Sequence, residues 1–299
     1  MAALIGAVEA GGTKFICAVG TGPDDLSEPA RFETRTPAQT VGECVAWFKA
    51  QQAERGPLAA IGIASFGPVD LHKESPTYGS ITTTPKRGWG NTPLVSMFED
   101  GLGLPVGFDT DVNGAALAEG RWGAAQGLDT FVYITIGTGI GGGVMAGGKL
   151  LHGMLHPEIG HILLRNDPRN DPYSGKCQYH GHCFEGLASG PAIEERWGVS
   201  GDLIPPAHPA WALEAHYIGL ALEILVCTLS PQRFILGGGV MKQAQLFPLV
   251  RAEVPRLLNG YVAAKEILED IDAYIVPPGL GDRAGVLGAI ALGQSIVED

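Results

Sequence analysis

The sequence predicts an α/β protein built from two halves of related construction. The first observation is the stretch from Thr130 to Gly148, in which an apolar, β-rich run opens into glycines and then resumes. The second is the stretch from Leu4 to Val19, which has the same pattern about half a chain earlier: an apolar run, an acidic residue, a Gly-Gly-Thr turn and another apolar run. The third is the alternation of β-like and helical segments around them. Two such strand–turn–strand segments predict two halves that face a shared ligand.

Composition restricts the class of protein. With 299 residues, of which 45% are hydrophobic, the chain is long enough for two cores. A net charge of −12 argues against nucleic acid as the main partner. Neither a basic leader nor a run of 18 apolar residues is present, so a cytoplasmic protein without a membrane partner is expected. Five cysteines, an odd number, make a disulfide framework unexpected.

The first half shows a regular order of elements after its hairpin. Hydrophobic spacing and breakers predict a short strand (Arg31–Thr36), a helix (Thr40–Arg55), a buried strand (Leu58–Phe66), a polar loop (72–91), a short helix capped by Thr92 (Thr92–Gly101), a strand (Pro105–Asp109) and a helix (Asp111–Arg121).

The second half follows the central hairpin with a polar insertion and then further elements. The pattern predicts helices at Leu187–Trp197 and Trp211–Leu229, a strand at Arg233–Leu236 that ends in three glycines, a helix at Gln243–Leu258, a strand at Ala273–Val276 and a small-residue helix at Arg283–Ile296 that can pack closely on a neighbour.

Five glycines crowd the turn of the central stretch, at positions 137, 139, 141, 142 and 143. Glycine adopts positive φ readily and lets a ligand lie against the main chain, so converging N–H groups are expected to bind an anion here. Thr138 adds a hydroxyl at the tip. The alternative is a purely structural hairpin.

The same turn admits a second functional interpretation. Gly137 to Gly142 matches the G-x-G-x-x-G pattern of dinucleotide-dependent oxidoreductases, with Glu158 at about the distance of a ribose-binding acid. That motif should open a helix, whereas the residues after Gly143 predict another strand and turn.

Asp111 falls where a predicted strand passes into a predicted helix. The carboxyl edge of a sheet usually presents functional side chains, which favours a catalytic carboxylate. Aspartate is also a good helix N-cap, so the alternative is that Asp111 only caps its helix.

A tight cluster of metal-binding residue types lies at Cys177, His180 and Cys183. Two cysteines and a histidine spaced by three positions, completed by one upstream histidine, form a tetrahedral Cys2His2 set of the kind that binds zinc. The upstream candidates include His152, His156 and His161, and His182 lies within the cluster.

Together these motifs resemble those of the ROK sugar kinases of the actin-like ATPase superfamily, and most closely the bacterial zinc-containing fructokinase branch. Glu9–Lys14 resembles the first phosphate motif, Thr135–Gly143 the second, and Ile235–Met241 the adenosine motif. Asp109–Ala116 and Ala284–Gly293 resemble the two connecting helices, so the resemblance spans essentially the whole chain.

The resemblance implies two actin-like (ribonuclease H-like) α/β domains with an active-site cleft between them. The expected boundaries are residues 1–117, with the helix at about 283–299 packing back on them, and residues 118–282, which carry a zinc loop at about 156–186. A homodimer is also implied.

The implied activity is ATP-dependent phosphorylation of a hexose, D-fructose first, with mannose or glucose as alternatives. Asp111 would be the base that accepts the sugar proton, and Glu9 would orient Mg²⁺ through its water shell. The residues expected to bind the nucleotide and its metal are Glu9, Gly11, Gly12, Thr13, Lys14, Thr138, Gly139, Pro191, Gly237, Gly238, Gly239 and Lys242. Those expected to bind the sugar are Thr110, Asn113, Glu158 and His161.

The resemblance also selects the fourth metal ligand. In the ROK signature, Glu158-x-Gly160-His161, the histidine contacts the sugar and binds zinc as well, so the expected ligands are His161, Cys177, His180 and Cys183.

Three positions depart from the common ROK pattern. Most members have Asp where Glu9 stands, Asn-Asp where Thr110-Asp111 stands, and a more cysteine-rich metal loop. These substitutions resemble the fructokinase branch. ROK-type sugar-sensing regulators are the remaining alternative, but they add an N-terminal helix-turn-helix, whereas the first phosphate hairpin here begins at Leu4.

Overall fold

The computed structural model describes residues 3–298, which form two compact units. Unit 1 contains the chain up to Gln126, the segment Leu150–His156 and the chain from Leu280 onward. Unit 2 contains Gly127–Lys149 and Pro157–Gly279. The predicted boundary at residues 117–118 lies within α3 (Asp111–Trp122), which packs against α10 (Ala284–Glu298) in unit 1.

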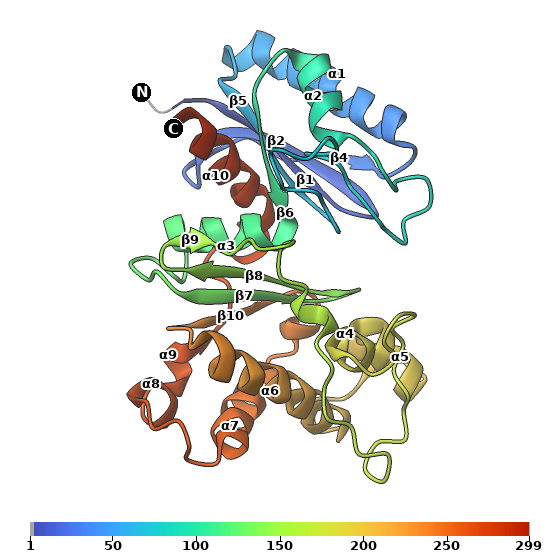
Figure 1. Cartoon of the computed structure of the whole chain (residues 1–299), viewed down its shortest axis with the longest axis vertical. Coiled ribbons are helices and arrows are strands. Elements are labelled where there is room, and N and C mark those ends of the chain that lie inside the picture. The colour runs from blue at the N-terminus through green and yellow to red at the C-terminus, as the bar shows by residue number, and fades with distance from the viewer. Residues whose placement is uncertain (1–2, 299) are drawn as a thin grey trace. The chain divides into compact units, whose positions relative to one another are not determined.

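Unit 1 is built on a mixed sheet with the strand order β3-β2-β1-β5-β6 (Figure 1). The predicted first hairpin is confirmed: β1 and β2 pair antiparallel, and β5 and β6 then add in parallel to β1. The strands are β1 (Ile5–Ala10), β2 (Lys14–Gly22), β3 (Asp25–Leu26), β4 (Ala30–Glu33, which pairs with β2), β5 (Ala60–Ser65) and β6 (Val106–Thr110).

The two faces of this sheet carry side chains of different size. Large residues such as Phe15, Ile61 and Ile63 share one hydrophobic cluster with residues of α1 (Pro37–Arg55) and α2 (Leu94–Leu102). The other cluster is rich in alanine and joins strand residues such as Ala7 and Ala64 to residues of α10. Alternate residues of a strand point to opposite faces, which is how one strand serves both clusters.

Glycine lets α10 lie directly on the sheet. A Cβ at Gly62 of β5 would lie 1.7 Å from the carbonyl oxygen of Ala289, and one at Gly288 would lie 2.3 Å from the backbone of Gly114 in α3. No side chain fits at these separations, so the helix backbone itself contacts β5 and α3. The expected close packing of the small-residue helix is therefore confirmed.

Unit 2 repeats the strand plan of unit 1. Strands β7 and β8 form an antiparallel hairpin, and β10 and β11 add in parallel to β7. The strand order is β11-β10-β7-β8-β9, with β7 (Phe131–Ile136), β8 (Ile140–Ala146), β9 (Lys149–Leu150), β10 (Phe234–Gly237) and β11 (Ile275–Val276). A hairpin followed by two parallel strands in each unit confirms the predicted α/β class with two related halves.

Helices make up the other regular elements of unit 2. They are α4 (Phe184–Ala188), α5 (Gly190–Trp197), α6 (Ala210–Leu229), α7 (Leu246–Leu258), α8 (Lys265–Leu268) and α9 (Ile271–Tyr274), with single 3₁₀ turns at Ile159–His161, Gly201–Leu203 and Val240–Lys242. The predicted helix from Gln243 thus begins later, because a 3₁₀ turn follows the three glycines.

Among the described residues, α6 is the helix that is long and apolar enough to cross a membrane by length and composition alone. More than half of its apolar window, 56%, is buried inside the protein. It packs against α7 and α4, which accounts for its apolar length as that of a core helix.

One predicted cap is wrong. Thr92 does not cap α2, which begins at Leu94 with Pro93 before it and has no side-chain cap. The Thr92 hydroxyl donates instead to the carbonyl oxygen of Trp89, 2.7 Å away.

Candidate active site

The junction between β6 and α3 presents Asp111 in the first turn of the helix. The N-cap is Thr110, whose Oγ1 accepts a hydrogen bond from the backbone N–H of Asn113 at 3.1 Å. The alternative in which Asp111 only caps its helix is therefore wrong. Burial raises the pKa of the Asp111 carboxyl to about 6, although a hydrogen bond from the Val112 N–H opposes the rise.

Glu9 lies at the same edge of the sheet as this junction. In the strand register, Glu9 of β1 is level with Ala64 of β5, which is level with Asp109 of β6. A Cβ at Gly285, in the first turn of α10, would lie 2.5 Å from the Glu9 carboxyl carbon, so glycine leaves the room that this carboxyl occupies. Burial, and then the negative charge of Asp111, raise the pKa of Glu9 to about 7.

Glu9→Gln is expected to stabilise the folded protein at high pH. The unfolded chain ionises this group near pH 4.5 and the folded chain near pH 7, so the ionised carboxylate opposes folding. The cost is absent below the lower value, grows between the two and is fully present above the higher one. Denaturant unfolding should show the variant gaining roughly 1–3 kcal/mol at about pH 8 and almost nothing at about pH 4.

The control for this experiment is Glu28→Gln, which makes the same chemical change at an exposed position. It should show no such pH-dependent gain. If Glu9→Gln gave equal effects at both pH values, burial of the Glu9 charge would be contradicted.

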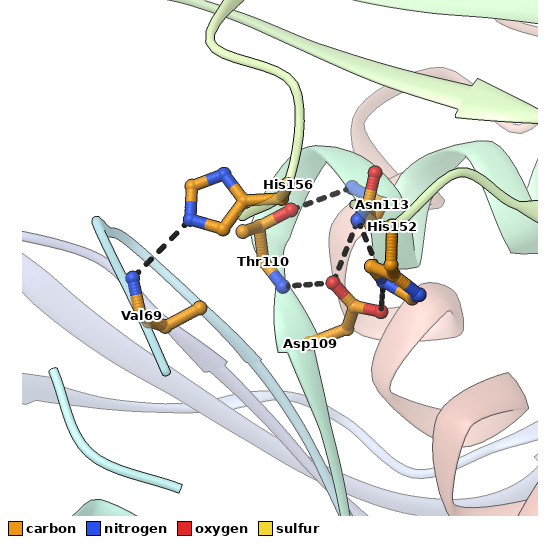
Figure 2. A network of polar contacts seen from close by, with 6 residues as sticks. All are labelled: Val69, Asp109, Thr110, Asn113, His152 and His156. Carbon is orange, nitrogen blue, oxygen red and sulfur yellow. Dashed lines mark hydrogen bonds and ion pairs between the residues drawn. The ribbon is translucent and has the colours of Figure 1, made fainter. Parts of the chain in front are cut away.

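Asp109, two positions before Asp111, is the centre of a network of polar contacts (Figure 2). Asp109 Oδ1 accepts from the Thr110 N–H and from Asn113 Nδ2, both at 2.7 Å. Asp109 Oδ2 lies 2.8 Å from His152 Nε2. The predicted sugar ligands Thr110 and Asn113 are thus both buried and already hold each other and Asp109 in place.

The first glycine turn, between β1 and β2, is closed by short backbone contacts. The Gly11 N–H donates to the carbonyl oxygen of Lys14 at 3.0 Å, and the Thr34 hydroxyl donates to the carbonyl oxygen of Gly11 at 2.7 Å. Thr13 and Lys14 are exposed, and Gly11 and Gly12 are partly so. This predicted phosphate turn lies at the tip of the hairpin and is therefore accessible to a ligand.

The second glycine turn differs from the expectation in one respect. None of the five glycines at positions 137, 139, 141, 142 and 143 has a positive φ. Two of them have close neighbours instead: a Cβ at Gly139 would lie 2.8 Å from Glu185 Oε2, at the flexible end of that side chain, and one at Gly142 would lie 2.7 Å from the Ile159 side chain. Glu185 Oε2 also accepts a hydrogen bond from the Ile140 N–H at 3.0 Å, so α4 is bonded to this turn.

The third glycine run, at the end of β10, lies next to the second turn in unit 2. Gly238 has a φ of 89°, and a Cβ there would lie 2.3 Å from the Ile136 carbonyl oxygen. On the other side, the Gly190 N–H donates to the Gly137 carbonyl oxygen at 2.8 Å, immediately before Pro191. The structure therefore brings the predicted nucleotide residues of unit 2 into one region, and Lys242 follows, exposed, in the 3₁₀ turn after β10.

The four predicted metal ligands lie together in unit 2. The ligand atoms of His161, Cys177, His180 and Cys183 all lie within 4.8 Å of one another. Sulfur-to-nitrogen distances are 3.8 Å for Cys177–His161, 3.7 Å for Cys177–His180 and 3.6 Å for Cys183–His161. A tetrahedral ion with sulfur at about 2.3 Å and nitrogen at about 2.0 Å separates its ligands by about 3.5 Å. Both the donor set and the spacing fit a closed zinc site.

The spare histidines are accounted for differently. His152 pairs with Asp109 at 2.8 Å, and His156 Nε2 accepts the Val69 N–H at 3.2 Å, all within unit 1. His182 is exposed and lies outside the cluster. The choice of His161 as the fourth member of the cluster agrees with the geometry.

Packing explains the glycine in Glu158-x-Gly160-His161. A Cβ at Gly160 would lie 1.9 Å from the carbonyl oxygen of Ile140, so this motif lies directly on the second glycine turn. His161 joins the metal cluster from that position, while Glu158 is exposed.

The sequence alone does not single out three residues that contact the predicted site residues: Asp109 and His152 in unit 1, and Glu185 in unit 2. Asp109 lies two positions before Asp111, and Glu185 two positions after Cys183, so proximity to predicted residues was the available signal. His152 was considered only as a metal ligand. Its partner is 43 residues away in sequence, which no local pattern reveals.

Comparison with known proteins places the chain among sugar-handling proteins. The sequence model of the ROK family matches residues 5–296. A fructokinase from Zymomonas mobilis subsp. mobilis (strain ATCC 31821 / ZM4 / CP4) is 44% identical over 97% of this chain and 96% of its own length.

Two solved structures match over nearly their whole length. A ROK hexokinase from Thermus thermophilus superposes with a TM-score of 0.81 at 28% identity, covering 99% of each chain. A ROK family glucokinase from Streptomyces griseus, solved in complex with glucose and AMPPNP, superposes with a TM-score of 0.75 at 27% identity, covering 98% of this chain and 99% of its own.

Proposed function

Because the chain belongs to the ROK family, we propose that it is an ATP-dependent fructokinase, which converts D-fructose and ATP to D-fructose 6-phosphate and ADP. The observation that carries the proposal is the partly buried Asp111 carboxylate, whose raised pKa suits a general base, at a strand end beside Glu9. Fructose is proposed first because the fructokinase relative shares 44% of its residues with this chain, whereas the hexokinase and glucokinase structures share 28% and 27%.

In the proposed reaction, Asp111 accepts the proton of the sugar 6-hydroxyl as its oxygen bonds to the γ-phosphorus of ATP. The bond between that phosphorus and the bridging oxygen breaks, and ADP leaves. A pKa of about 6 keeps Asp111 ionised at neutral pH while making it a stronger base than an ordinary aspartate. Phosphoryl transfer needs little else from the protein beyond positioning and charge neutralisation.

The nucleotide is proposed to bind the three glycine turns. Exposed backbone and side chains suit contacts with phosphate oxygens in the first two turns, and the third would lie against the adenosine. The proposed residues are Gly11, Gly12, Thr13, Lys14, Thr138, Gly139, Pro191, Gly237, Gly238, Gly239 and Lys242. Mg²⁺ would neutralise phosphate charge, and Glu9 would hold its water shell.

The dinucleotide alternative is not supported by the structure. In that class, the glycine motif opens a helix whose N-terminus binds the pyrophosphate. Here the residues from Ile140 to Ala146 form β8. The glycine turn of unit 2 is a hairpin turn.

The sugar is proposed to be bound by Thr110, Asn113, Glu158 and His161. His161 would bind both the metal and the sugar. Its Nδ1 faces the cysteines of the metal cluster, and its other ring nitrogen, Nε2, would bind a sugar hydroxyl. The cluster of His161, Cys177, His180 and Cys183 is proposed to bind a structural Zn²⁺, because four protein ligands leave no open position. A cytoplasmic homodimer completes the proposal, on the basis of the family resemblance.

A hexose panel tests the proposal. With ATP and Mg²⁺, D-fructose should give the highest kcat/KM in a coupled ADP-release assay, and the product should be the 6-phosphate by NMR. Mannose and glucose are the competing substrates, and a higher kcat/KM for either would make the enzyme a mannokinase or glucokinase. ADP release no faster with any hexose than without one would refute the kinase assignment.

A further inference from the structure

We propose that Asp109 and His152 are positioning residues for the phosphoryl transfer, which hold the Asp111 backbone and the Asn113 amide in their working arrangement. The inference rests on the proposed function, since Asp111 is the proposed base. Neither residue belongs to the predicted catalytic, sugar, nucleotide or metal sets.

Asp109 holds the chain on both sides of Asp111. It is 3% exposed, and its Oδ1 accepts from the Thr110 N–H and from Asn113 Nδ2. Thr110 Oγ1 accepts in turn from the Asn113 N–H, which closes a ring of three hydrogen bonds (Figure 2). In the chain, Asp111 lies between Thr110 and Asn113, two members of this ring, so its backbone is held from before and after.

The carboxylate also decides which way the Asn113 amide faces. An ionised carboxylate only accepts hydrogen bonds, so the atom of Asn113 that faces Asp109 is the NH₂ group. The amide oxygen, Oδ1, is then turned away, and it is buried without a hydrogen-bond partner within residues 3–298. Buried acceptors are normally satisfied, so this oxygen is the atom of Asn113 that a hydroxyl donor would reach.

His152 keeps the second oxygen of Asp109 occupied. Its Nε2 lies 2.8 Å from Asp109 Oδ2, and this hydrogen bond, aided by the Asp109 charge, raises the pKa of the imidazole. This contact holds the carboxylate in the orientation in which Oδ1 accepts from Thr110 and Asn113.

The segment that carries His152 is itself fastened within unit 1. His156 Nε2 accepts the Val69 N–H at 3.2 Å, and His72 Nε2 lies 2.7 Å from the Met154 carbonyl oxygen. The segment Leu150–His156 therefore contacts the chain after β5 and the end of β6 at three points. This explains how a 40% exposed histidine maintains a fixed contact with a buried carboxylate.

The first test compares kinetics. Asp109→Ala removes both acceptor oxygens, so kcat with fructose should fall by about 10- to 100-fold, as small misplacements of catalytic groups do. The KM for ATP should change by less than about threefold, since the glycine turns are untouched. His152→Gln, at a half-exposed site where folding is not at risk, should lower kcat by about 3- to 10-fold.

The matched control is His216→Gln. His216 also pairs with a carboxylate, Glu253, at 2.6 Å, but in unit 2 and outside the proposed site. Its kcat should match that of the wild type even if its unfolding midpoint falls. If His152→Gln lowered kcat no more than His216→Gln does, the positioning role would be refuted.

A double-mutant cycle separates positioning from general damage. If Asp109 acts through Asn113, then in an Asn113→Ala background Asp109→Ala should lower kcat much less than it does alone. Full additivity would assign the Asp109 effect elsewhere and overturn this part of the inference.

An NMR measurement that does not depend on enzyme activity tests the inference separately from the proposed kinase function. In ¹⁵N-asparagine-labelled protein, the Asn113 side-chain NH₂ signal, identified by its loss in Asn113→Ala, should be protected from solvent exchange. The protection should vanish in Asp109→Ala, which has no acceptor at this position. Retained protection would refute the network, whereas wild-type protein inactive on every hexose would refute only the proposed function.

Discussion

Asp111→Asn is expected to lower kcat by roughly 10²- to 10⁴-fold, the usual range for loss of a general base. Asparagine has nearly the same shape, so the helix start and its Thr110 cap should remain, and only the proton acceptor is lost. ATP affinity, measured by calorimetry, should change little. Wild-type activity should also decline as the pH falls through about 6, where the base becomes protonated.

The control is Asp100→Asn, the same chemical change on the exposed surface of α2. It should leave both kcat and its pH dependence unchanged. A near-normal kcat in Asp111→Asn, with the fold verified by circular dichroism, would refute the assignment of the base and leave Asp111 as an ordinary residue of the first helical turn.

The strand plan was predictable from sequence because its signals are local. Each hairpin consists of two apolar runs around a short glycine turn, and the same pattern occurs twice. The reason for glycine at a given position could not be predicted from local sequence patterns. In the second turn no glycine has a positive φ, and the close neighbours of Gly139 and Gly142 are the Glu185 and Ile159 side chains, which are distant in sequence.

The same limit applies to the candidate site. Asp111 was identified because it lies at a strand-to-helix junction, and the metal cluster because Cys177, His180 and Cys183 are regularly spaced. Capping could not be assigned to Thr110 over Asp111 by residue type, since both are good caps. The Asp109–His152 pair depends on how the segment Leu150–His156 returns to unit 1, which is tertiary information.

Cys177→Ser is expected to remove the metal and, with it, the order of the loop at 166–183. This loop has little regular structure of its own: its backbone is held by isolated bridges such as Leu163–Cys183 and Cys177–Gly181. Structural zinc contributes on the order of 10 kcal/mol to a small site, so its loss should lower the unfolding midpoint and make the loop sensitive to protease.

The functional consequence should be greater for the sugar than for ATP. His161 links the cluster to the Glu158-x-Gly160-His161 motif, so disorder at the cluster should displace two of the four proposed sugar ligands, Glu158 and His161. The glycine turns of unit 2 lie instead on the hairpin of β7 and β8 and at the end of β10. Fructose affinity should therefore fall before ATP affinity does in titrations of the variant.

Elemental analysis should find about one zinc per chain in the wild type and much less in Cys177→Ser. The control is Cys227→Ser, which alters an exposed cysteine on α6 outside the cluster and should retain the metal, the loop and the sugar affinity. Four protein ligands would close the coordination sphere of the proposed zinc, so we expect its effect on the sugar to pass through His161 and the loop. Full sugar affinity in protein shown to be free of metal would contradict that role.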